Sequence, residues 1–150
     1  MVTMERGSYP NSDELLKLGD EELSAASILI KGDGPVRHIR RHVHGAVELF
    51  LKAYVVSKDA NLITATNSPL YKHDLIPLYE KCCHFDATFQ NLSSDVNLLA
   101  RDYPANIGRA GCETSVEAHY NPQDDLDKSD TDAWFDSAIR IGDFVKTHIC

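Results

Sequence analysis

The sequence predicts an all-α protein, a single up-and-down bundle of about five helices with a four-helix core and one extra helix. Apolar residues recur every three or four positions in several long segments, as one face of a helix requires. No segment shows the strict alternation of a half-buried strand. At 150 residues and 43% hydrophobic, the chain can bury the core of one domain. We expect one domain over residues 1–150, with its helical part at about 13–148.

Start and stop residues delimit the first two predicted helices. Ser12 is a suitable N-cap, and Asp13 and Glu14 place negative charge in the first turn. The breaker KGDGP then ends this helix. Pro35 suits the first turn of a second helix, which we expect to run to about Ser57.

The third and fourth helices are shorter. DLIPLYEKCCHF reads as a helix that tolerates Pro77 in its first turn, with Asp74 as N-cap. Ser94 opens a fourth helix, and Pro104 ends it, because the residue before a proline disfavours helical backbone.

A long loop is predicted at about 104–128, followed by the last helix. The segment contains two glycines and Pro122 and has no clear period. Ser129 and Asp132 resemble a capping box, and the apolar positions after them repeat at helical spacing. Trp134 and Phe135 are expected in the core and at an interface. Long loops in compact domains are often functional or mobile.

The composition argues against several kinds of function. The formal net charge of -8 argues against a general affinity for nucleic-acid backbones, although a small basic patch remains compatible with it. The N-terminus lacks a signal-peptide pattern, and no apolar run is long enough for a membrane span. The four cysteines form no CxxC motif, so we expect reduced thiols and a cytoplasmic location.

The second helix carries an unusual polar stripe. Its apolar positions share one face, and an opposite stripe is formed by Arg37, Arg41, His44, Glu48 and Lys52. Glu48 and Lys52 have the favourable i,i+4 order of an ion pair. Two interpretations stay open: a solvated helix face, or a patch that binds an anion or a partner.

Histidines one turn apart raise the question of a metal. His38 and His42 could share an ion, but nothing near them in the sequence supplies the third and fourth ligands that zinc requires. We therefore expect no metal site and no cofactor.

Three motifs, in order, resemble the HEPN family: HGAVELFLKAY (residues 44–54), KHDLIPLYEKC (72–82) and LLARDYP (98–104), followed by an amphipathic last helix. The resemblance covers about residues 13 to 148 and implies a five-helix bundle. It also implies a small homodimer encoded beside a minimal nucleotidyltransferase, in a toxin–antitoxin-like pair. Other members are metal-independent RNases, whose signature is Arg, four to six residues, then His.

Carried onto this chain, the RNase signature is incomplete. Arg101 stands where the family arginine belongs, but the positions where the histidine is expected hold Ala, Asn, Ile and Gly. Asn106 can form hydrogen bonds but cannot act as a general base near neutral pH. His119 follows Arg109 with nine residues between them, which is too many for the signature. Catalysis is therefore not expected.

The sequence thus predicts a non-catalytic homodimer that binds a nucleotide or another anion and acts with a nucleotidyltransferase. Its expected ligand-binding residues are Arg101, Glu48, Lys52, Arg41 and Asn106. One alternative is an RNase toxin in which Arg101 acts with His119 folded in from elsewhere. Another is a structural interaction module whose partner-binding element is the 104–128 loop.

Overall fold

The computed structural model describes residues 10–59, 61, 74–102 and 130–149, with the backbone alone at 101 and 102. Over these residues it contains five α-helices, one 3-10 helix and no strand, which confirms the predicted all-α bundle. The elements are α1 (Ser12–Lys31), α2 (Val36–Lys58), α4 (Leu75–Phe85), η2 (Ala87–Leu92), α5 (Ser93–Asp102) and α7 (Asp130–Ile149).

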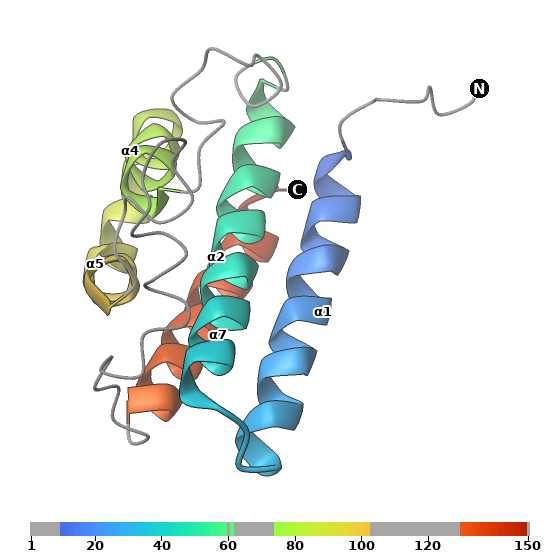
Figure 1. Ribbon diagram of the computed structural model, residues 1–150. Coiled ribbons are helices and arrows are strands. Elements are labelled where there is room, and N and C mark those ends of the chain that lie inside the picture. The colour runs from blue at the N-terminus through green and yellow to red at the C-terminus, as the bar shows by residue number, and fades with distance from the viewer. Residues whose placement is uncertain (1–9, 60, 62–73, 103–129, 150) are drawn as a thin grey trace, which may run out of the picture.

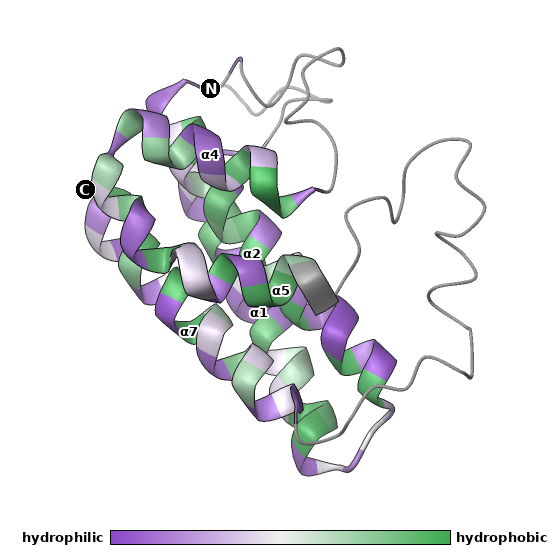
Figure 2. Ribbon diagram, turned by 90° about the vertical axis from the view of Figure 1, so that its left-hand side faces the viewer, coloured by the Kyte–Doolittle hydropathy of each residue, from purple (hydrophilic) through white to green (hydrophobic). Residues whose placement is uncertain are grey.

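Three long helices form the body of the bundle, with α2 at its centre. α1, α2 and α7 run side by side, and α4 and α5 lie on one flank of α2 and α7 (Figure 1). α5 is seen almost along its axis in Figure 1 and from the side in Figure 2, so it lies across the long helices. Green and purple alternate along the helices in Figure 2, as expected for amphipathic elements that each bury one face. No helix in the described part of the chain is both long and apolar enough to cross a membrane.

The turn structures at the ends of α1 set its limits. The N-cap of α1 is Asn11 and not Ser12, so the predicted N-cap lies one residue too far toward the C-terminus. The Asn11 side chain accepts from the Glu14 amide and the Glu14 side chain accepts from the Asn11 amide, both at 2.8 Å. This reciprocal capping box satisfies two amides that the helix cannot satisfy itself. At the other end, Asp33 has φ 61° in the turn that leads to α2.

The short helices differ from the prediction in two respects. Asp74 occupies the N-cap position of α4 as expected, but its side chain makes no capping hydrogen bond and is buried instead. The 3-10 helix η2 is not predicted by the sequence pattern. Asp86 caps it by accepting from the Thr88 amide, and the three-residue spacing of buried Phe89 and Leu92 fits its three residues per turn.

The last helix, α7, packs against α2. α7 begins at Asp130 with Asp132 in its first turn, whereas Ser129 of the predicted capping box lies outside the described residues. Trp134 is fully buried, which confirms its predicted place in the core, and Phe135 packs against the core while half-buried.

The three long helices meet at one aromatic ring. Phe50 of α2 is fully buried between Gly19 of α1 and Gly142 of α7. A Cβ atom built on Gly19 would lie 2.6 Å from Phe50 Cε1, and one built on Gly142 would lie 2.8 Å from Phe50 Cε2. Both values are below any contact that real Cβ atoms make, so glycine at these two positions is what lets α1 and α7 approach α2.

We expect Gly19→Ala and Gly142→Ala each to lower the free energy of unfolding by about 1–3 kcal/mol, the usual cost of overpacking a core. Gly45→Ala is the matched control, because its added Cβ would meet the nearest Glu22 atom at 3.7 Å. That variant gains helix propensity and should be stabilised by up to about 1 kcal/mol. Urea denaturation measures all three.

The double variants with Phe50→Leu test whether the ring itself causes the loss. A smaller side chain frees the space that the new methyl group needs, so the cost of each alanine should shrink in the Phe50→Leu background. Equal costs in both backgrounds would show that Phe50 is not the obstacle.

Candidate functional site

Four ionisable side chains form one buried row along α2, each four residues after the one before. Arg40 and His44 are 6% exposed, and Glu48 and Lys52 are 8% exposed. Residues four apart lie on the same side of a helix. We call these four residues the charged row. It is the densest group of buried charged side chains in the part of the molecule that the structure describes.

Of the two interpretations left open for the polar stripe, the solvated face is therefore wrong for His44, Glu48 and Lys52. A helical wheel with one core face suits a helix at the surface, but α2 contacts α1, α4 and α7. The Cys82 thiol of α4 donates a hydrogen bond to the Leu51 carbonyl of α2 at 3.7 Å. Because Glu48 is one turn before Leu51, α4 covers the side of α2 next to the charged row. Burial also raises the pKa of the Cys82 thiol.

Glu48 is the centre of the charged row. The Lys52 ammonium donates to Glu48 Oε2 at 2.6 Å, which confirms the predicted i,i+4 pair. The His44 Nδ1 atom lies 4.0 Å from the other carboxylate oxygen. One carboxylate thus lies between a lysine and a histidine, and all three side chains are nearly excluded from water. Charges in such surroundings interact more strongly than on the surface, and they cost more to bury.

A second basic group lies in the first two turns of α2. Arg41 and Arg37 are half-buried, and Arg41 Nη2 donates to His38 Nδ1 at 3.0 Å. Burial and the positive charges of Arg41, Arg37 and His42 lower the pKa of His38. His38 is therefore neutral at pH 7, which leaves its Nδ1 free to accept from the guanidinium.

The two histidines considered for a metal have separate partners. His42 Nδ1 lies 2.6 Å from Glu22 Oε1 on α1, whereas His38 contacts Arg41. Among the described residues, no group of three or more His, Cys, Asp or Glu side chains is placed to hold a metal ion.

The predicted ligand-binding residues divide into two sets. Arg41, Glu48 and Lys52 lie on the same side of α2, spread over about three helical turns. Arg101 lies in the last turn of α5, where only the backbone is described. Figure 2 shows the first turn of α4 and the last turn of α5 at the same edge of the molecule as the first half of α2. Asn106, His119 and the 104–128 loop lie outside the described residues, so the roles expected for them stay predictions.

Sequence reasoning did not find two buried charges at this edge. The sequence pattern does not single out Arg40 and gives Asp74 only a capping role, yet both are 6% exposed. The available signal was the regular i,i+4 series that runs from Arg40 to Lys52. The series places the four side chains on one stripe of the helix, but a polar stripe is equally typical of a solvated face, so the sequence alone does not reveal its burial.

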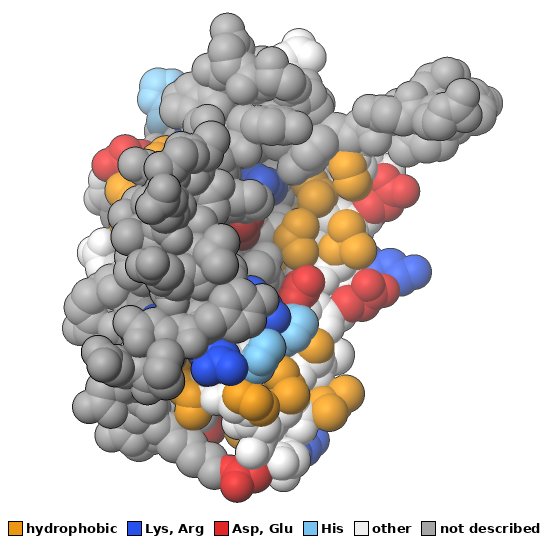
Figure 3. Space-filling view, in the orientation of Figure 1, with side chains coloured by type: hydrophobic (Ala, Val, Ile, Leu, Met, Phe, Trp, Pro, Cys, Tyr) orange, Lys and Arg blue, Asp and Glu red, His pale blue; other side chains and the backbone are white. Residues whose placement is uncertain are grey.

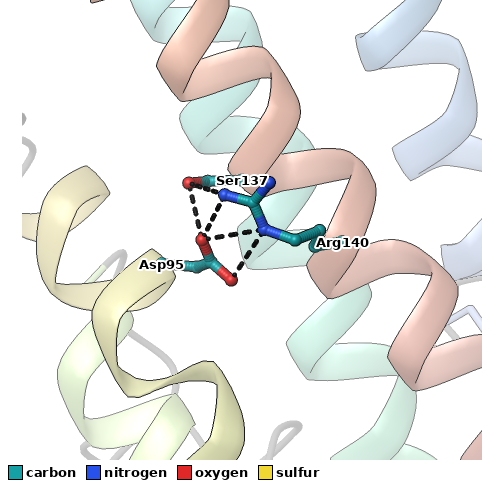
Figure 4. Close-up of polar contacts among 3 residues, drawn as sticks. All are labelled: Asp95, Ser137 and Arg140. Carbon is teal, nitrogen blue, oxygen red and sulfur yellow. Dashed lines mark hydrogen bonds and ion pairs between the residues drawn. The ribbon is translucent and has the colours of Figure 1, made fainter.

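A second polar cluster joins α5 to α7 (Figure 4). Arg140 donates to both carboxylate oxygens of Asp95, at 2.7 to 3.2 Å, and Ser137 Oγ donates to Asp95 Oδ1 at 2.8 Å. These contacts raise the pKa of Arg140. The cluster contains no histidine, and the Asp95 carboxylate is fully engaged, so we interpret it as a structural link that fixes the start of α5 on α7.

Comparisons with known proteins give no further information on this site. Protein-family models, curated proteins and solved structures all yield no match to this chain.

The electrostatics of His38 can be tested directly. In Arg41→Gln the pKa of His38 should rise toward 6.5, because the variant removes a neighbouring positive charge. NMR titration of the imidazole signals measures it, with Arg140→Gln on the far helix as control. A wild-type value at or above 6.5 would contradict the structure.

The same shift gives a pH dependence of stability. The unfolded chain binds a proton at His38 near pH 6.5, whereas the native protein binds it only at lower pH. Protonation therefore favours unfolding, and this contribution to stability falls as the pH drops below about 6.5.

Proposed function

We propose that this chain is a non-catalytic, HEPN-like protein that binds an anion, the phosphate groups of a nucleotide, against the charged row and the adjacent basic turns of α2. The observation that carries the proposal is the burial of Arg40, His44, Glu48 and Lys52 in one row. Three of these four side chains carry, or can carry, a positive charge.

The energetics of burial favour a functional role for the row. Removing two charges from water costs several kcal/mol per ion, and their attraction repays this only in part. Apolar residues of similar volume are often as stabilising as a buried ion pair, or more so. Stability alone therefore gives little reason for Glu48 and Lys52, whereas functional sites often hold buried, interacting charges.

The sign and geometry of the charges favour an anion. Arg37, Arg40 and Arg41 lie within two turns of α2, and no acidic residue is present in its first turn. Guanidinium groups bind phosphate through paired hydrogen bonds, and Glu48 holds the Lys52 ammonium in one place. The chain as a whole carries -8, so this end of α2 is a local exception to the overall field.

The proposed partner is a nucleotidyltransferase, in a toxin–antitoxin-like pair. Its support is the resemblance of the three sequence motifs, two of which include the end of α2 and the last turn of α5. RNase activity has no support from a described side chain, because it requires Arg101 and His119. RNA cleavage is therefore one of the outcomes that the binding experiment is designed to reveal.

Replacing both residues of the ion pair together distinguishes an effect on ligand binding from an effect on stability. In Glu48→Leu/Lys52→Met both charges leave the buried row, and the melting temperature should stay the same or rise. ATP binding should weaken at least about tenfold, since a charge-assisted hydrogen bond contributes about 1.5–3 kcal/mol. Calorimetric titration with ATP, GTP, inorganic phosphate and a short RNA measures the binding.

Asp20→Asn/Lys146→Met is the matched control for this experiment. It removes an ion pair of the same kind, at 2.8 Å, that joins α1 to α7 on the surface. Its ATP affinity should equal that of the wild type. The proposal fails if the wild-type chain gives no heat with any of the four ligands, or if Glu48→Leu/Lys52→Met binds ATP as the wild type does. Cleavage of the RNA during titration would favour the RNase alternative.

A further inference from the structure

The burial of the charged row limits the shape of the anion that can reach it. The row runs from Arg40 to Lys52, which is about 18 Å along the helix axis. None of its four side chains is more than 8% exposed. An internal phosphate of a nucleic-acid strand has a nucleotide on both sides, so such a strand follows basic groups that lie along an open groove. The free end of a phosphate chain has a neighbour on one side only, and it is the part that can enter the row.

Arg41 lies where the charged row meets the surface. It is half-buried and lies on the same side of α2 as Glu48, about two turns earlier in the helix. Its Nη2 atom donates to His38 Nδ1 at 3.0 Å, which uses one of the five N–H groups of the guanidinium. Lysine or arginine side chains and histidine side chains gather over the first half of α2 on the face seen in Figure 3. Because Arg41 is the more exposed group, a ligand on this face meets it before the buried Lys52.

The charges around the row favour a terminal phosphate over an internal one. α2 contributes four permanent positive groups, three guanidinium groups and the Lys52 ammonium, against the carboxylates of Glu48 and of Asp74 at the start of α4. A terminal phosphate carries about 1.5–2 negative charges at pH 7 and presents three acceptor oxygens, whereas an internal phosphodiester carries one charge. The excess of positive charge is therefore matched better by a terminal phosphate, and an unmatched charge in the interior is costly.

We propose that the charged row binds the free end of a phosphate chain, the triphosphate of a nucleotide or of an RNA 5′ end, and excludes an internal phosphodiester. The terminal phosphate contacts the Lys52 ammonium, and the inner phosphates contact Arg41. The recognised chemistry is the same in the free nucleotide and in the RNA end. This inference rests on the proposed anion site and names the class of anion that the site accepts.

Two forms of one short RNA that differ only at the 5′ end test this preference. One carries a 5′-triphosphate and the other a 5′-hydroxyl, so their internal phosphodiesters are identical. Calorimetric titration of the full chain at about pH 7.5 keeps the terminal phosphate doubly charged. The triphosphate form should bind at least about tenfold more tightly, because it alone can form the charge-assisted hydrogen bonds of a terminal phosphate. ATP, titrated in parallel, measures binding of the free nucleotide.

Arg41→Gln tests the place assigned to the inner phosphates. The variant should bind ATP about tenfold more weakly than the wild type, whereas its affinity for AMP, which has a single phosphate, should change by less than about twofold. Lys58→Gln is the matched control, because it removes a positive charge from the exposed end of α2, more than about four turns from Arg41. Its affinities for ATP and AMP should equal those of the wild type. A purely structural effect of Arg41 would lower both affinities by the same factor.

The outcomes separate this inference from the proposed anion site. If ATP binds but the two RNAs bind equally, or the triphosphate RNA does not bind, the preference for a free chain end is wrong and the anion site stands. If Arg41→Gln weakens ATP and AMP by the same factor, the place of the inner phosphates is wrong. If the wild type binds none of these ligands, the anion site fails and this inference fails with it. Circular dichroism melts establish that both variants are folded.

Discussion

The packing of Phe50 between two helical glycines is the constraint on which the rest of the bundle depends. Gly19 and Gly142 allow α1 and α7 to contact the ring at distances that no Cβ would permit. The ring therefore fixes both the spacing of the three long helices and the rotation of α2 about its axis. Lys146 of α7 adds to this junction, because its ammonium lies 5.6 Å from the centre of the same ring and bonds Asp20 of α1.

The rotation of α2 determines where its charges lie. At about 100° per residue, Glu48 and Lys52 are about 160° from Phe50 on either side, and so lie on the far side of the helix. In a bundle of three helices that side would be in water. Here α4 covers its flank through the Cys82–Leu51 contact, and the charged row becomes buried. The same contact that completes the core thus creates the candidate site.

The sequence predicts the fold well because local rules determine the helices. Caps, breakers and apolar periodicity locate all five α-helices to within one or two residues of their observed ends wherever both are described. The site was harder to predict. A helical wheel recognises one buried face, and it cannot reveal that α4 covers a second one. In the sequence, Gly19 and Gly142 only lower the helix propensity of their segments. Their role, close contact with Phe50, is visible only in three dimensions.

The buried pair of Glu48 and Lys52 also restricts which substitutions this protein can accept during evolution. A substitution at either position leaves an opposite charge in the interior beside a neighbour that no longer matches it. Losing the pair one residue at a time passes through a single variant that is less stable, whereas a chain that retains both residues avoids this loss of stability. Related chains should therefore vary at these two positions jointly, and a chain that carries one without the other should carry a compensating change on α4.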